Sequence, residues 1–223
     1  MEKYIIIVAG GTGNRMGANV PKQFLPLNGE PILACTLRAF ANWGNIILVL
    51  PETQMTYWQS LCKNLRDMPD YKMVAGGEQR FYSVYNALQF VPDGALVAVH
   101  DGVRPLVSQT CINRVFTLAE EMGSALPVIN CVDSLRHISN GSSLSVNRNE
   151  YVCVQTPQVF NSTNLKKAYQ QPYKECFTDD ASVYESATYK INLCDGNIEN
   201  IKITTPIDLI HAEAILKNGF DKV

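Results

Sequence analysis

The chain has 223 residues, 46% of them hydrophobic and 18% charged, a composition typical of a folded globular protein rather than a disordered one. Its 19 Lys and Arg against 21 Asp and Glu give a net charge of -2, so the overall charge favours neither nucleic acid nor an anionic membrane as a partner. This length suffices for one large core, and we expect a single domain over residues 1–223.

The cysteines and the first residues bear on the compartment. The seven cysteines are odd in number, scattered and without Cys-x-x-Cys spacing, which predicts reduced, mostly buried thiols rather than a disulfide framework or a zinc site. Acidic Glu2 stands where a targeting segment would carry basic residues, and no run of about 20 apolar residues is present to span a bilayer. We therefore expect a cytoplasmic protein.

The first half of the chain alternates predicted strands and helices. Continuous apolar runs predict buried strands at 4–9, 45–50, 72–75 and 96–100. Helical spacing of apolar residues predicts helices at 31–44, at 53–66, over the segment that carries 83–88, and from the cap at Ser108 to about Met122. This alternation predicts a mostly parallel, twisted sheet with helices on both faces.

A glycine-rich loop follows the first predicted strand. It holds three glycines and two cations: Gly10, Gly11, Gly13, Arg15 and Lys22. Glycines let the backbone approach an anion closely, so the loop is a candidate polyphosphate site. The dinucleotide fingerprint fails because Met16 stands at the third glycine position, and the triphosphatase loop fails because Pro21 precedes Lys22. The alternative is a surface turn with solvated cations.

Two further segments follow predicted strands. A second glycine turn at 76–80 follows the strand at 72–75, and a polar cluster at 100–105 follows the strand at 96–100. In an open α/β sheet, ligands bind beyond the carboxyl ends of the strands, so both segments should share a rim with the first loop. For Asp101 and Arg104, an ion pair that only closes the loop is an equally good interpretation.

The pattern changes from residue 125 onward. After a predicted strand at 125–129, residues 131–157 show no helical period and a polar turn at 139–143, which predicts a projecting β-hairpin arm. The arm lacks a core of its own, so we expect it to pack on a partner subunit. His137 lies in it without a second histidine at ligand spacing, and we expect a surface residue rather than a metal ligand.

The last third of the chain contains shorter predicted elements. They are helices at 161–171 and 178–187, strands at 189–193 and 200–203, and a final helix with Thr205 as N-cap and Pro206 at its first position. The acidic pair Asp179 and Asp180 lies in the first turn of the second helix, where the helix macrodipole accounts for it without a function.

Seven sequence blocks occur in an order that is specific in combination. They are AGGTGNRMG (9–17), PKQF (21–24), GEQRFYSV (77–84), HDGVRP (100–105), QTPQVF (155–160), TDDAS (178–182) and NIKIT (200–204). Together they resemble the 2-C-methyl-D-erythritol 4-phosphate cytidylyltransferase family over nearly the whole chain. The resemblance implies a Rossmann-like three-layer nucleotidyltransferase fold, and transfer of a cytidylyl group from CTP to a sugar-alcohol phosphate, with Mg2+, in isoprenoid precursor synthesis.

The resemblance also implies roles for individual residues. The implied catalytic cations are Arg15, Lys22 and Lys202. The implied CTP-binding residues are Ala9, Gly10, Gly11, Gly13, Gly77, Glu78, Arg80, Ser83, Asp101 and Gly102. The implied acceptor-binding residues are Asp101, Arg104, Ser134, Arg148, Thr156 and Thr178, and Asp101 is the implied metal ligand.

The resemblance implies a homodimer in which the arm crosses to the neighbouring subunit and helps to bind the acceptor there. Ser134 departs slightly from the family, which usually has threonine at this position. Two alternatives stay open: ribitol 5-phosphate cytidylyltransferase, which also shares AGG (9–11), RNE (148–150) and TTP (204–206), and a noncatalytic nucleotide-binding domain. The spacing of Arg80 and Ser83 and the TDDAS block favour the methylerythritol enzyme over the ribitol enzyme.

Overall fold

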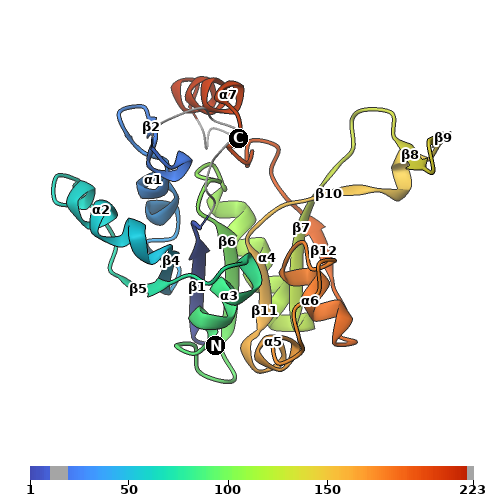
Figure 1. The fold of residues 1–223 in the computed structure, drawn as a ribbon, viewed down its shortest axis with the longest axis horizontal. Helices are drawn as coiled ribbons and strands as arrows, with labels where there is room; N and C mark the ends of the chain where they lie inside the picture. Colours follow the sequence, from blue (N-terminus) through green and yellow to red (C-terminus); the bar gives the residue numbers. More distant parts are fainter. Residues whose placement is uncertain (11–19, 220–223) are drawn as a thin grey trace.

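The computed structural model describes residues 1–10 and 20–219. Within these residues, eight strands form one sheet (Figure 1). The strands are β1 (Lys3–Val8), β4 (Asn45–Leu50), β5 (Tyr71–Ala75), β6 (Leu96–Asp101), β7 (Ser124–Asn130), β10 (Val152–Val154), β11 (Gln158–Asn161) and β12 (Leu193–Asp195). Their order is β5-β4-β1-β6-β11-β7, with β10 and β12 also paired to β7.

Most of the sheet is parallel. β1 pairs in parallel with β4 and β6, β4 with β5, and β7 with β12. Two strands run the other way: β11 is antiparallel to β6 and β7, and β10 is antiparallel to β7. The prediction of a mostly parallel sheet is confirmed, and its carboxyl edge gathers the ends of β1, β4, β5 and β6.

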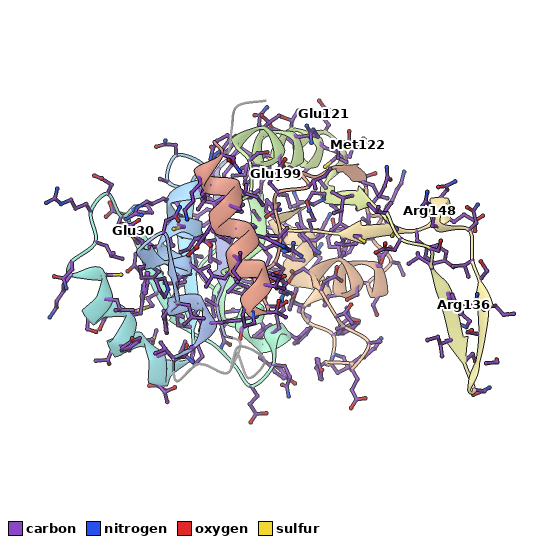
Figure 2. All side chains as sticks on the ribbon, turned by 90° about the horizontal axis from the view of Figure 1, so that it is seen from above. Glu30, Glu121, Met122, Arg136, Arg148 and Glu199 are labelled. Carbon is purple, nitrogen blue, oxygen red and sulfur yellow. The ribbon has the colours of Figure 1, made fainter. Side chains whose placement is uncertain are left out.

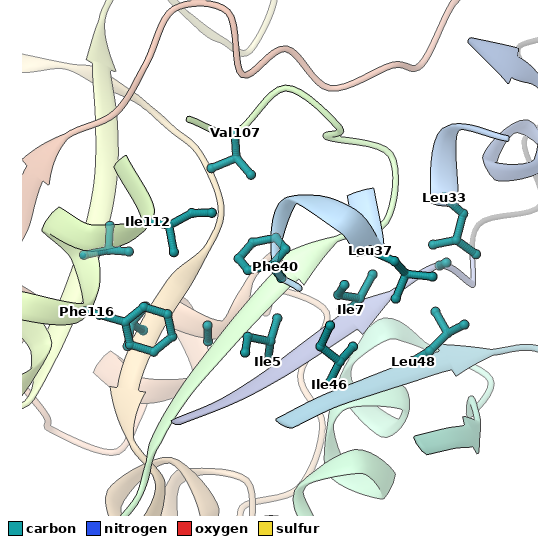
Figure 3. Packing of buried hydrophobic residues seen from close by; sticks show 14 of the residues in the cluster. Ile5, Ile7, Leu33, Leu37, Phe40, Ile46, Leu48, Val107, Ile112 and Phe116 are labelled. Atoms are coloured by element: carbon teal, nitrogen blue, oxygen red, sulfur yellow. The ribbon is translucent and has the colours of Figure 1, made fainter. Parts of the chain in front are cut away.

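Helices cover both faces of the sheet. Ile5 and Ile7 of β1 point to one face and pack with α1 (Ile32–Ala39), α2 (Glu52–Cys62) and α4 (Gln109–Met122), as Figure 3 shows for part of this cluster. Ile6 points to the other face, against α3 (Arg80–Leu88), α5 (Ser162–Ala168) and α6 (Asp180–Ser186). All three isoleucines are fully buried, and each contributes about 1.5–3 kcal/mol by leaving water. The three-layer prediction is confirmed.

Short elements complete the described chain. They are β2 (Pro26–Leu27), β3 (Glu30–Pro31), the 3-10 helices η2 (Lys22–Phe24) and η3 (Arg148–Glu150), and α7 (Pro206–Lys217). The predicted cap positions are present, since Ser108 Oγ accepts from Cys111 N, and Thr205 is the N-cap residue of α7, with its N–H donating to Asp208 Oδ2.

The predicted arm is a β-hairpin that extends from the body of the molecule. β8 (Arg136–Ser139) and β9 (Ser142–Ser145) pair with each other only, and every residue in them is exposed. Asn140 and Gly141 form the turn with positive φ, as a tight hairpin requires. Arg136 and Arg148 lie far from the sheet in Figure 2. The last part of the predicted range, β10, belongs to the central sheet instead.

One predicted strand is displaced toward the C-terminus, and one is absent. The segment 189–192 forms no strand, and pairing with β7 begins at Leu193; the segment 200–203 forms no strand either. Isolated backbone bonds, from Leu126 N–H to Asn192 O and from Ile203 N–H to Val103 O, are joined there by side-chain bonds from Asn200 Nδ2 to Thr156 O and from Asn192 Nδ2 to Ser124 Oγ. Ile203 instead packs into a small cluster with α7, so its apolar character reports burial and not a strand.

The thiols are less buried than predicted. Cys111 is buried, whereas Cys153 and Cys176 are exposed and the other four are partly exposed. Cys153 lies on β10 at the base of the arm, and Cys176 lies on the loop before α6; both are outside the core. None of the described helices is long and apolar enough to cross a membrane.

Candidate active site

A cavity of about 230 Å³ opens at the carboxyl edge of the sheet, between the segments that follow β1, β5 and β6. Its lining is Val8, Ala9, Gly10, Lys22, Gln23, Gly77, Glu78, Gln79, Arg80, Ser83, Asp101, Val103 and Lys202. Ala9, Gly10 and Lys22, the described residues that flank the first glycine loop, share this rim with the second glycine turn and the polar cluster, as predicted for these residues. The chain thereby brings two of its three predicted catalytic cations to one place.

The floor of this cavity is fixed by a buried glutamine that the sequence did not reveal. Gln23 Nε2 donates to Ala9 O over 2.8 Å and lies 2.7 Å from Gln54 Oε1. The next residue, Phe24, stacks on Trp58 in the core, with ring centroids 5.8 Å apart. These contacts hold η2 rigidly against the sheet, so Lys22 projects from a fixed backbone.

The second glycine turn is held by a serine. Gly77 N–H donates to Ser83 Oγ over 3.1 Å, and the Ser83 hydroxyl donates to Gln79 O over 3.2 Å. A Cβ at Gly77 would stand 2.4 Å from the Cβ of Tyr82, so a larger residue would displace the turn. Two of the predicted CTP-binding residues, Gly77 and Ser83, are therefore tied to each other within this turn.

Asp101 is surrounded by cations. Its Oδ2 lies 3.2 Å from Arg104 Nε and 3.1 Å from Lys202 Nζ, and its Oδ1 lies 3.9 Å from Arg80 Nε. Burial alone would raise the pKa of the Asp101 carboxyl, but the three cations hold it well below its ordinary value. The ion pair between Asp101 and Arg104 exists, and it lies in the wall of a cavity rather than only closing a loop.

Arg80 is held by a second carboxylate. Its Nη2 lies 2.6 Å from Asp180 Oδ2, and Tyr169 donates its hydroxyl to Asp180 Oδ1 over 2.6 Å. Burial would lower the pKa of the Arg80 guanidinium, but the charges of Asp180 and Asp101 hold it above its ordinary value. Asp179 caps α6 and Asp180 lies in its first turn, as the helix-dipole interpretation expects, but Asp180 also pairs with Arg80, which the local pattern did not indicate.

A second cavity, of about 260 Å³, lies beside the first. Its lining is Arg80, Asp101, Arg104, Val154, Gln155, Thr156, Gln158, Thr178, Asp179 and Lys202. The predicted acceptor residues Arg104, Thr156 and Thr178 therefore meet here. Arg80, Asp101 and Lys202 line both cavities, so a charged junction separates the two.

Buried His100 braces this junction. Its Nε2 lies 3.0 Å from Arg104 O, which can only accept, so Nε2 carries the proton and Nδ1 accepts from the Thr156 hydroxyl over 3.0 Å. Thr156 Oγ1 in turn accepts from Asp101 N–H over 3.1 Å. The histidine fixes the orientation of Thr156 and is not placed as a metal ligand.

His100 should make stability depend on pH. Burial lowers its pKa to about 4 from an ordinary 6.5, so over this interval the unfolded chain binds a proton that the native state does not. We expect the free energy of unfolding to fall by about 3 kcal/mol from this residue as pH drops through that window. Asp101, with its lowered pKa, loses its contribution only at more acidic pH.

Urea denaturation between about pH 7 and about pH 4.5 measures this slope. His100→Gln should flatten it, whereas His137→Gln on the exposed arm should leave it unchanged. An equal slope in both variants would contradict the assignment.

Some predicted site residues lie elsewhere. Gly102 lines neither cavity; it packs behind Ala9, where an added Cβ would stand 2.7 Å from the Ala9 Cβ. Ser134 and Arg148 lie exposed on the arm and line neither cavity within their own chain. The predictions for Gly11, Gly13 and Arg15 lie outside the described residues.

The described residues suit a magnesium ion only in part. They contain no group of three His, Cys, Asp or Glu side chains that would form a complete metal cage. Asp101 Oδ1, however, makes no hydrogen bond within 1–10 and 20–219, with Arg80 Nε 3.9 Å away, so this oxygen suits a cation. Mg2+ typically binds through one or two carboxylates together with substrate phosphates, and the site fits that pattern.

Comparisons with known proteins agree along almost the entire chain. The family model described as IspD, 2-C-methyl-D-erythritol 4-phosphate cytidylyltransferase, matches residues 4–218. A protein of that name from Porphyromonas gingivalis is 52% identical over 217 residues, which cover 96% of this chain and 98% of the relative. Another, from Phocaeicola vulgatus, is 48% identical over 219 residues, which cover 97% and 100%.

Solved structures agree as well. The 4-diphosphocytidyl-2C-methyl-D-erythritol synthase of Anaerococcus prevotii has a TM-score of 0.82 at 25% identity, covering 97% of this chain and 96% of that one. The 2-C-methyl-D-erythritol 4-phosphate cytidylyltransferase of Thermus thermophilus has a TM-score of 0.79 at 30% identity, covering 97% and 100%. Fold and site thus define an α/β nucleotidyltransferase enzyme. Within that class, the chain belongs to the 2-C-methyl-D-erythritol 4-phosphate cytidylyltransferase family, which confirms the resemblance of the seven blocks.

Proposed function

We propose that the chain transfers a cytidylyl group from CTP to 2-C-methyl-D-erythritol 4-phosphate and releases pyrophosphate, as a step of isoprenoid precursor synthesis. The observation that supports it is the pair of adjacent cavities, which share Arg80, Asp101 and Lys202. One cavity suits the nucleotide and the other suits the acceptor, so the α-phosphate and the attacking phosphate would meet at the charged junction.

The nucleotide cavity supplies a device for reading the base. Ser83 fixes the backbone of Gly77, so the peptide groups of Gly77 and Glu78 keep a set direction. Cytosine carries an amino donor where uracil carries a carbonyl acceptor. A backbone carbonyl fixed in this turn would accept from cytosine and repel uracil, which favours CTP over UTP.

The chemistry needs positioned cations more than a protein nucleophile. An oxygen of the acceptor phosphate attacks the α-phosphorus in line, the bond from that phosphorus to the β-phosphate bridging oxygen breaks, and pyrophosphate leaves. Lys22 and Lys202, with Arg15 beyond the described residues, would stabilise the negative charge that builds on the oxygens. Mg2+, held by Asp101 and the substrate phosphates, would supply further charge neutralisation.

The direct test is pyrophosphate release with CTP and each candidate acceptor in turn. We expect turnover with 2-C-methyl-D-erythritol 4-phosphate and little with ribitol 5-phosphate, and little with UTP in place of CTP. Preference for ribitol 5-phosphate would support the sister activity instead. Binding of CTP with no turnover on either acceptor would support the noncatalytic alternative.

The arm supports a further part of the proposal, a homodimer. Val132, Ile138 and Leu144 are 83%, 76% and 68% exposed, more than isolated surface positions require. In the hairpin register Leu144 faces His137 and Ile138 faces Ser143, so each face carries an apolar residue. Packing on a second copy would cover them, and would carry Ser134 and Arg148 of the partner subunit toward the acceptor cavity.

Replacing two arm residues tests this arrangement. Ile138→Asp with Leu144→Asp should yield a monomer by sedimentation velocity and lower turnover at limiting acceptor, because charges oppose burial at the contact. Circular dichroism should be unchanged, since both side chains lie outside the core. A fully active monomer would contradict the shared site.

Consistent with these assignments, we also infer a cytoplasmic enzyme that folds as a single domain.

A further inference from the structure

One buried charge is not explained by the proposed chemistry. Asp180 is fully buried at the start of α6, where its Oδ2 lies 2.6 Å from Arg80 Nη2, while Asp101, which both cavities share, lies 3.9 Å from Arg80 Nε. It lines neither cavity, so it touches no substrate directly. Burying a carboxylate costs free energy unless it is paired and hydrogen-bonded, so the role of Asp180 has to be inferred from the residues that it contacts.

The partners of Asp180 are themselves rigid. Tyr169 is 2% exposed and stacks on Phe81, with centroids 4.7 Å apart, so its hydroxyl cannot follow a moving carboxylate. The start of α6 is tied to β11, because Gln158 accepts from Ala181 N over 2.9 Å and donates to Asp179 over 2.8 Å. Asp180 is thus a fixed anchor on the sheet.

Arg80 is the partly exposed member of this set, with 29% of its side chain accessible. Within the described chain its one hydrogen bond goes to Asp180, and its distance of 3.9 Å to Asp101 is too long for another. A guanidinium has five N–H donors in a planar fork. The two printed carboxylate contacts are at Nη2 and Nε, and no hydrogen bond to the described residues uses Nη1, so the Nη1 donors can serve an anion in the two cavities that Arg80 lines.

We propose that Asp180, seated by Tyr169, is a positioning residue that aims Arg80 at the junction where the phosphates of both substrates meet. This inference rests on the proposed function, because it assigns Arg80 to the α-phosphate of the transferred cytidylyl group rather than to the fold. Asp180 acts through Arg80 alone. Its loss should therefore be felt in the rate of transfer, while recognition of the base at Gly77 and Ser83 continues.

Asp180→Asn is the first variant, because asparagine keeps the shape but presents no charge to Arg80. We expect kcat to fall about 10- to 100-fold, the range caused by misplacing a catalytic group by about 1 Å, with KM for CTP nearly unchanged. Tyr169→Phe should give a smaller fall in kcat, again with KM for CTP nearly unchanged. The matched control is Asp93→Asn, the same change in an exposed ion pair with Lys166, which should leave both constants unchanged.

A double-mutant cycle separates positioning from a structural role. If Asp180 acts through Arg80, then Asp180→Asn should cost nothing further in an Arg80→Gln background. The double variant also avoids leaving an unpaired buried charge, so it should be the better folded of the two Arg80 variants by urea denaturation. Independent, multiplying effects on kcat in the cycle would overturn the inference, as would an equal rise in KM for CTP with no change in kcat.

The outcomes distinguish this inference from the proposed function. If the unsubstituted chain releases pyrophosphate but Asp180→Asn is equally active while folded, only the positioning role is overturned. If the unsubstituted chain releases none with any acceptor, the proposed function falls and the inference falls with it. Binding of a non-hydrolysable CTP analogue, unchanged in Asp180→Asn, would support the separation of base recognition from transfer.

Discussion

Substituting Lys22 with alanine is expected to lower kcat/KM for cytidylyl transfer about 100- to 1000-fold while the fold stays intact. The ammonium group lines the nucleotide cavity from a backbone that Phe24 and Gln23 fix in the core. Charge on the leaving pyrophosphate grows in the transition state, and removal of one positioned donor typically costs this much. Pyrophosphate release at saturating and limiting CTP measures the loss.

Two controls accompany this variant. Lys63→Ala removes an exposed lysine at the end of α2, and we expect it to change neither activity nor the free energy of unfolding by more than about 0.5 kcal/mol. Lys22→Arg should recover only part of the rate, because a planar fork does not occupy the position of a compact ammonium. Near-normal transfer by Lys22→Ala would refute the role of this cation.

The sequence predicted correctly the strands, caps and turns that depend on residues close to one another in the chain. The apolar run at 4–9 corresponds to β1, a central strand. Because Ile5, Ile6 and Ile7 are consecutive and all apolar, both faces of this strand have to be buried. The cap at Ser108 and the turn at Asn140 were equally predictable. The Ser108 hydroxyl bonds to a residue three positions away, and the positive φ of Asn140 shapes only the turn that contains it. The rim followed from the parallel order of the strands.

The remaining site residues depend on contacts distant in sequence. Arg80 and Asp180 are 100 positions apart, and nothing near either one indicates that they pair. Asp180 sits where a helix dipole already explains a carboxylate, so the local explanation hid the tertiary one. Gln23 is similar, because a buried amide that holds a backbone carbonyl looks like any surface glutamine in sequence.

Apolar runs misled where another element took the place of a strand partner. Ile201 and Ile203 suggested a strand, yet they pack against α7 and the loop after β6, and Ile203 N–H donates to Val103 O in that loop instead of to a neighbouring strand. The arm shows the complementary case. Its existence was readable from sequence, whereas the position of Ser134 and Arg148 relative to an acceptor would depend on the proposed second copy of the chain.

Replacing Asp101 with asparagine is expected to separate nucleotide binding from turnover. The carboxylate is shared by Arg104, Lys202 and Arg80, and the amide keeps its shape without its charge. The cations then repel one another, and Lys202, whose side chain is 43% exposed, is freest to move away. We expect kcat to fall about 100- to 1000-fold and the free energy of unfolding to fall by about 1–3 kcal/mol.

The same substitution should strengthen the binding of CTP when metal is absent, although it lowers kcat. The Asp101 carboxylate repels a triphosphate, so Asp101→Asn should bind CTP more tightly than the unsubstituted chain in a chelator. Added Mg2+ should then strengthen binding in the unsubstituted chain more than in the variant, because the variant lacks the oxygen proposed to hold the ion. Titration calorimetry with and without Mg2+ measures both effects. Weaker binding of CTP under both conditions would mean that Asp101 serves only to hold the three cations in place, and would contradict its proposed role toward the metal.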